Sequence, residues 1–214
     1  MRQFWLTIFM FISIISLGKT PSKVYDIANI FNDLTMIIES GGSQTKLCEI
    51  LTQINKYSLG PIPDGYLVGD PSNDEPPIDG HIIFIPSIID SLSRGNNGHN
   101  YALKAYEEFS KTNKSANDAC IETKVIGANS THIFTLVTKG VQEIAVVAEH
   151  YGRLSLIVTD IDNNITQVER SMESEGKSFR YIKYLPPDGQ GTYKLRIQVD
   201  NKRNIEMSYA LILN

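Results

Sequence analysis

Residues 193–200 read YKLRIQVD, an alternation of apolar and polar residues without a break. Successive side chains of a β-strand point to opposite faces, so Tyr193, Leu195, Ile197 and Val199 share one face. The polar residues between them share the other face. The stretch therefore predicts a strand with one buried face and one face in water.

The C-terminal part of the chain repeats this kind of segment. Alternate residues are apolar in 205–213, and 144–148 is a continuous apolar run, which is typical of a strand covered on both faces. Turn-forming Asn, Pro and Gly residues separate the segments. Short strands at such regular spacing favour a two-sheet antiparallel sandwich. We predict strands at 132–138, 142–150, 153–160, 164–170, 178–184, 192–200 and 205–213.

Glycine and tyrosine recur at the starts and ends of these segments. Gly140 precedes an apolar segment, GRLSLIV spans 152–158, GTYKLRI spans 191–197 and SYAL spans 208–211. In these features residues 130–214 resemble the bacterial pre-peptidase C-terminal (PPC) type of domain. That family is a small jelly-roll-like sandwich appended to secreted proteins. The resemblance implies the same fold and an extracytoplasmic setting for this chain.

The first residues have the features of a secretory signal peptide. Arg2 supplies a positive charge, 4–17 is an apolar core, and Ser16 and Gly18 are small residues that suit cleavage after position 18. The core is shorter than the roughly 20 residues of a membrane-spanning helix. We expect 1–18 to be a signal peptide and the protein to be secreted or periplasmic, with no membrane span after cleavage. An uncleaved membrane anchor is the alternative.

The segment after the signal peptide predicts two amphipathic helices, at 20–40 and 44–56, joined by Gly41 and Gly42. Their apolar stripes either pack within the protein or form a partner-binding groove or dimer face. The domain plan is a helical region at 19–112, a linker at 113–129 and the sandwich at 130–214. The predicted fold class is therefore α+β, a small helical N-terminal part followed by an antiparallel jelly-roll-like β-sandwich.

Within the helical region, residues 61–80 are rich in proline and aspartate. We expect an irregular, solvated loop there. A calcium site formed by its carboxylates is the alternative, although the spacing does not match an EF-hand loop.

Cys48 and Cys120 are the only cysteines. An even count in an exported chain suggests that they form a disulfide, which would join the second helix to the base of the sandwich. In the chain-entropy model a loop of this length contributes about 4 kcal/mol to stability. Two free, buried thiols are the alternative.

The sequence shows no catalytic motif. The four histidines, His81, His99, His132 and His150, form no metal-binding pair, and no nucleophile elbow or phosphate-binding loop is present. The formal net charge of −4 gives no basic patch of the kind that binds nucleic acid. The sequence thus indicates no catalytic residue, cofactor or metal, and no nucleic-acid partner.

Two classes of function remain. The first is an exported, non-catalytic protein whose sandwich binds protein, peptide or glycan, or has a structural role. For that face we single out Tyr151, Arg180 and Tyr184, because exposed aromatic and arginine side chains are typical of contact surfaces; plain surface or edge packing is the other interpretation of these residues. The second class is a secreted enzyme or inhibitor with a site at the junction of the helical part and the sandwich, lined by residues 61–85.

Overall fold

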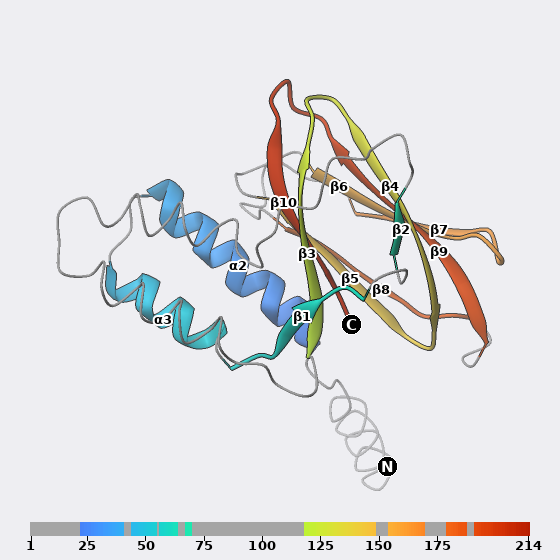
Figure 1. Cartoon of the computed structure of the whole chain (residues 1–214), viewed down its shortest axis with the longest axis horizontal. Coiled ribbons are helices and arrows are strands. Elements are labelled where there is room, and N and C mark those ends of the chain that lie inside the picture. Colours follow the sequence, from blue (N-terminus) through green and yellow to red (C-terminus); the bar gives the residue numbers. More distant parts are fainter. Residues whose placement is uncertain are drawn as a thin grey trace, which may run out of the picture.

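Two layers of β-sheet form the body of the protein, with helices against one of them (Figure 1). The computed structural model describes residues 22–40, 44–54, 56–63, 67–69, 118–148, 154–169, 179–187 and 191–214. These ranges contain two helices and ten strands. The predicted α+β class, a small helical part followed by an antiparallel β-sandwich, is confirmed.

Each layer is a five-stranded sheet. Sheet A has the order β1 (Leu59–Pro61), β3 (Ala119–Ile126), β10 (Met207–Leu213), β5 (Gln142–Ala148) and β8 (Phe179–Tyr184). Sheet B has the order β2 (Leu67–Gly69), β4 (Thr131–Lys139), β9 (Thr192–Asn201), β6 (Leu154–Asp160) and β7 (Ile165–Glu169). All neighbouring strands are antiparallel except β1 and β3, which are parallel.

The main core lies between the two sheets. Tyr193, Leu195, Ile197 and Val199 of β9 are at most 4% exposed, so the face that the alternation predicted is buried. Their neighbours in the core come from the inward faces of both sheets, among them Leu136 of β4 and Leu211 of β10. Because every second residue of these strands is apolar, the two sheets stack on one continuous apolar layer.

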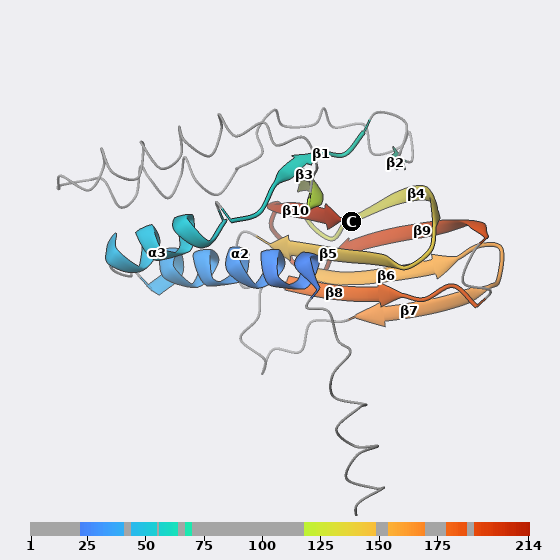
Figure 2. The same ribbon diagram turned by 90° about the horizontal axis from the view of Figure 1, so that it is seen from below.

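A second core lies on the outer face of sheet A, beneath α2 (Lys23–Ser40) and α3 (Gln44–Ile54). The apolar stripe of α2, which includes Phe31 and Leu34, packs against residues of β5, β10, β3 and β8. Figure 2 shows α2 lying along the strands. Sheet A is thus covered on both faces, and every residue of β5 is buried, as the apolar run at 144–148 predicted. Those residues of the helical stripes whose side chains the structure describes pack within the protein.

Hydrogen bonds fix α2 to sheet A at two places. The Oγ of Ser22 accepts a hydrogen bond from the backbone N–H of Tyr25 (3.0 Å), which caps the helix, and donates one to Oε2 of Glu143 in β5 (2.7 Å). Further along the helix, Thr35 Oγ1 donates to the carbonyl oxygen of Ala148 at the end of β5 (3.3 Å). The helix therefore has a fixed position on the sheet.

Two predicted boundaries are wrong. Residues 119–126, assigned to the linker at 113–129, form β3 between β1 and β10. The polar Glu122 and Lys124 conceal this strand in the sequence, because they take the positions where an inward face normally has apolar residues. Within the predicted irregular loop at 61–80, Leu67–Gly69 forms the edge strand β2; most of that loop lies outside the described residues.

Cys120, in β3, has a free thiol in this structure. The side chain of Cys48 lies outside the described part, so the predicted disulfide between the two stays a prediction, which mass spectrometry with and without reductant will test. Neither described helix is long and apolar enough to cross a membrane.

Candidate functional site

The residues singled out from the sequence do not form an exposed site. Tyr184 is 0% exposed and Arg180 is 5% exposed, so the expectation that they lie on a contact surface is wrong. Both belong to β8, where Arg180 Nη1 donates to the carbonyl oxygen of Phe179. Tyr151 lies outside the described residues.

Tyr184 instead joins the two sheets. Its hydroxyl donates to Oδ2 of Asp160 at the end of β6, and its ring lies 5.4 Å from that of Tyr193. Asp160 Oδ1 also accepts from the backbone N–H groups of Asp162 and Asn163, both at 3.0 Å. The carboxylate is 0% exposed. It therefore holds the β6–β7 turn and the edge of sheet A together.

The electrostatics of this pair follow from its burial and its hydrogen bonds. Burial alone disfavours the charged carboxylate of Asp160, but hydrogen bonds from Asn163, Tyr184 and Asp162 outweigh it and lower the pKa of Asp160. Burial, and then the hydrogen bond to Asp160, raise the pKa of Tyr184 well above its usual range. Both effects describe a structural contact between an ionised carboxylate and a neutral phenol.

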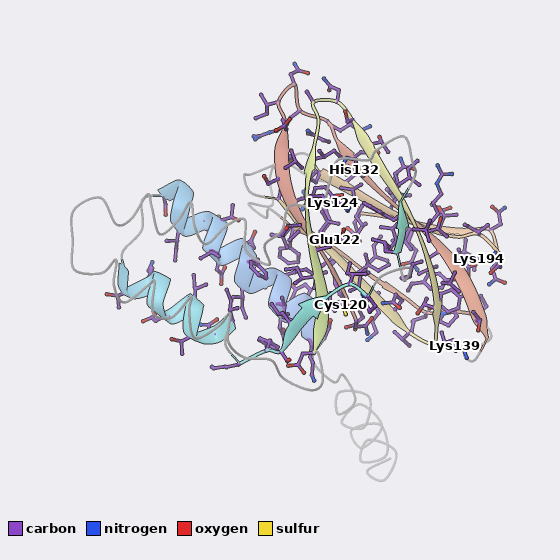
Figure 3. The ribbon with its side chains drawn as sticks, in the orientation of Figure 1. Cys120, Glu122, Lys124, His132, Lys139 and Lys194 are labelled. Atoms are coloured by element: carbon purple, nitrogen blue, oxygen red, sulfur yellow. The ribbon has the colours of Figure 1, made fainter. Side chains whose placement is uncertain are left out.

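A row of polar side chains lines the inward face of β3. Figure 3 shows Cys120, Glu122 and Lys124 in succession along this strand, with His132 of β4 near the far end of the row. Lys124 Nζ lies 2.8 Å from Oε1 of Glu122 and 5.4 Å from the centre of the Phe134 ring. His132 Nδ1 lies 2.9 Å from the hydroxyl of Tyr209.

These groups satisfy one another. The Glu122–Lys124 ion pair neutralises two charges at the edge of the core, and His132 is 6% exposed. Burial raises the pKa of the Cys120 thiol, which disfavours the thiolate that a cysteine nucleophile needs. No group of residues able to hold a metal ion is present in the described part of the chain. The row lies between the two sheets; most of residues 61–85, the predicted lining of a site at the helix–sandwich junction, lie outside the described residues.

The exposed surface with a regular arrangement is the outward face of sheet B, which we call the open face. It differs from the outward face of sheet A because no described helix covers it (Figure 2). Cross-strand registers place its residues side by side: Val137 with Lys194, Thr135 with Arg196, and Ile157 with Val168. Its outward residues are Val68, Thr131, Ile133, Thr135, Val137, Lys139, Ser155, Ile157, Thr159, Thr166, Val168, Thr192, Lys194, Arg196, Gln198 and Asp200.

The open face combines apolar and basic groups. Val68, Val137 and Val168 are 59%, 47% and 42% exposed. Lys194 and Lys139 lie at the end where β9 begins and β4 ends, and Figure 3 shows them on the side of the molecule away from the helices. Within the described ranges their ammonium groups form no ion pair.

Carboxylates lie at the borders of the open face. Asp200 is 5% exposed and accepts hydrogen bonds from Thr131 Oγ1 (2.8 Å) and Gln198 Nε2 (2.9 Å). Asp162 accepts from the backbone N–H of Lys194 (3.0 Å) through Oδ2. Both carboxylates are therefore engaged in local structure, and the exposed charges within the face are the basic ones.

The sequence contained the signal for this surface. The alternation of 193–200 already placed Lys194 and Arg196 on the face in water, but it did not show which strands lie beside them. That neighbourhood requires the register, since β4 and β9 are about 60 residues apart in the chain.

Comparison with known proteins gives a limited result. No protein-family model and no curated protein matches the chain. Among solved structures, the Yersinia pseudotuberculosis-derived mitogen aligns with 45% of this chain and 84% of its own at 12% identity and a TM-score of 0.35. PliG of Aeromonas hydrophila, a periplasmic inhibitor of g-type lysozyme, aligns with 45% of this chain and 84% of its own at 17% identity and a TM-score of 0.32.

A carbohydrate-binding module, Family 16 Carbohydrate Binding Module-2, aligns with 42% of this chain and 72% of its own at 14% identity and a TM-score of 0.28. At these identities and TM-scores the similarities assign neither a family nor a ligand. The candidate site therefore depends on the geometry of the chain itself.

Proposed function

We propose that this protein is a non-catalytic binding module that acts outside the cytoplasm and docks an acidic protein on the open face of sheet B. The observation that carries the proposal is the difference between the two outward sheet faces: helices bury that of sheet A, while that of sheet B presents exposed valines beside Lys139, Lys194 and Arg196.

The composition of the face favours an acidic partner. Its exposed valines supply apolar area, and its cations supply a positive potential on a chain whose net charge is −4. The outward positions of β4, β9, β6 and β7 hold no aromatic ring. A protein surface that combines carboxylates with apolar side chains complements this arrangement in both respects.

Binding to poly-L-glutamate tests this function. We expect the protein to bind the immobilised polymer at low salt and the double variant K139E/K194E to lose most of that affinity. Because exposed charges are screened within a Debye length of about 8 Å at physiological ionic strength, added salt should weaken the wild-type interaction. Surface plasmon resonance over a salt series measures both effects.

The matched control is K46E/K56E, which makes the same change of net charge in and just after α3, on the side of sheet A, where both lysines are exposed. Equal losses in the two double variants would show a nonspecific charge effect and overturn the proposal. So would binding of cellohexaose or another neutral glycan that both double variants retain, because that result would assign the protein to glycan binding.

Export and family membership belong to the same proposal. We propose that residues 1–18 direct the chain to the periplasm or the medium, and that 130–214 is a PPC-type sandwich. The order of short antiparallel strands over 131–213 supports the second point. N-terminal sequencing of the protein recovered outside the cytoplasm would test the first, with residue 19 as the expected start.

A further inference from the structure

The strand β7 ends sheet B on the side opposite to β2 (Figure 2). It pairs with β6, from Asp160↔Ile165 to Leu156↔Glu169, and with no other strand of the described part. An edge strand presents unpaired N–H and C=O groups to any chain that can align with it.

The hydrogen-bond pattern shows which residues of β7 carry these groups. Residues of an antiparallel strand bond alternately to the neighbour on one side and the neighbour on the other. The backbone N–H of Ile161, directly after β6, donates to the carbonyl oxygen of Lys194 in β9 (2.9 Å). The odd-numbered residues of β6 therefore bond to β9, and its even-numbered residues bond to β7. The partners of those even-numbered residues are Ile165, Gln167 and Glu169. Thr166 and Val168 therefore direct their N–H and C=O groups away from the sheet.

The side chains of β7 leave this edge open. Ile165 and Val168 are 37% and 42% exposed, and the strand contains neither lysine nor proline, two residues that commonly block edge pairing. Its single charged residue, Glu169, lies at the last position of the strand. Neither Thr166 nor Val168 has a further partner for its outward backbone groups in the described part of the chain. Among the described residues, β7 therefore has no strand beside it other than β6.

We propose that β7 pairs with β7 of a second copy of this chain, antiparallel and around a two-fold axis at Gln167. In this register the outward N–H and C=O groups of Thr166 bond to those of Val168 in the second copy, and those of Val168 bond to Thr166 of the second copy. All five residues of the strand are then opposite a residue of the second copy. The two sheets B become one continuous sheet.

The sequence of the strand, ITQVE, suits pairing with itself in this register. Glu169 lies opposite Ile165 of the second copy, so no like charges meet, and β-branched Thr166 and Val168 pair on the exposed face. A two-fold contact of this kind is closed, because each copy uses the same edge once. The two open faces then lie side by side in the dimer.

Sedimentation velocity of the purified protein over a concentration series tests the dimer. We expect a monomer–dimer equilibrium in the wild type. The variant V168P removes an outward N–H from each copy and leaves the bonds to β6 intact, since proline is tolerated where the N–H of an edge strand faces solvent. Loss of two backbone hydrogen bonds per dimer should raise the dissociation constant roughly 30-fold.

A charge pair at Gln167 tests the register and does not depend on the folding of the proline variant. The two Gln167 residues form a non-hydrogen-bonded pair with Cα atoms about 4.5 Å apart, so Q167K alone and Q167E alone should each weaken the dimer. A mixture of Q167K and Q167E should form a heterodimer about fivefold tighter than either homodimer.

A wild-type protein that is monomeric at every concentration would overturn the inference. So would a dimer that V168P, shown by circular dichroism to be folded, leaves unchanged, or one in which the mixture of Q167K and Q167E is no tighter than the separate variants. The results at Gln167 are independent of binding to poly-L-glutamate, since Gln167 lies opposite the inward-facing Val158 and is not a residue of the open face. Val168 belongs to that face, so V168P is judged by sedimentation alone.

Discussion

At the scale of single residues, the contact between Asp160 and Tyr184 is the clearest case of a polar group that the core requires. The carboxylate is fully buried and accepts hydrogen bonds from the β6–β7 turn and from a tyrosine of the other sheet. Burying a charge without such partners would cost roughly several kcal/mol. The carboxylate of Asp160 can therefore be buried only because these hydrogen bonds are made.

We expect Y184F to lower the free energy of unfolding by about 2 kcal/mol at neutral pH, because a hydrogen bond to a buried charged group contributes roughly 1.5–3 kcal/mol. Urea titration measures this change. Y25F is the matched control: the Tyr25 side chain is partly exposed and packs edge-on against Phe179 and Tyr181, so we expect a change below about 0.5 kcal/mol. Equal effects of the two variants would contradict the structural role of the Tyr184 hydroxyl.

The same contact predicts a pH dependence. The pKa of Asp160 is lower in the folded protein than its ordinary value of 3.8, so the carboxylate adds stability that is complete well above pH 3.8 and is lost as the pH falls through the folded pKa. In Y184F one of the lowering bonds is absent. The difference between the wild type and Y184F should therefore shrink when urea titrations are repeated at about pH 3. A difference that stays constant would show that the hydroxyl does not act on the ionised carboxylate.

At the scale of elements, α2 stabilises the sandwich by covering the outer face of sheet A, a sheet that is apolar on both faces. Leu34 is 0% exposed within the core between α2 and sheet A, whereas Met36 on the same helix is 37% exposed. The element therefore offers a buried and an exposed position in one turn.

We expect L34A to lower the free energy of unfolding by about 2–5 kcal/mol, because it removes apolar area and leaves a cavity against sheet A. M36A should change it by less than about 0.5 kcal/mol, since alanine is a good helix former and the side chain is partly in water. Chemical denaturation of both variants measures the contrast. Similar small losses in both would mean that α2 contributes little to the stability of the sandwich.

At the scale of the whole molecule, the helices and the sandwich share one structure. Sheet A has the inter-sheet core on one face and the helix core on the other, so that β5 belongs to both. The predicted plan, a helical region separated from the sandwich by a linker, overlooked this arrangement. Strand β1 lies in the predicted helical region and β3 in the predicted linker, yet the two pair in sheet A.

We predict that the helices and the sandwich unfold in one cooperative transition. Far-UV circular dichroism, which reports mainly on the helices, and tyrosine fluorescence, to which the buried Tyr184, Tyr193 and Tyr209 of the sandwich contribute, should then give coincident urea curves. Two separated transitions, with the helical signal lost first, would show that α2 and α3 form an independent unit.

The sequence by itself determined the seven strands β4 to β10 and the buried face of β9, since the direction of a side chain in a strand depends only on whether its position is odd or even. This is why Tyr193, Leu195, Ile197 and Val199 were predicted correctly. Pairing, and cover on the second face of a sheet, depend on segments distant in the chain, and no local pattern contains them. Only the tertiary structure therefore showed that β3 belongs to sheet A and that Tyr184 and Arg180 are buried. It also showed that, among the described residues, no helix covers the outward face of sheet B and β7 pairs with β6 alone.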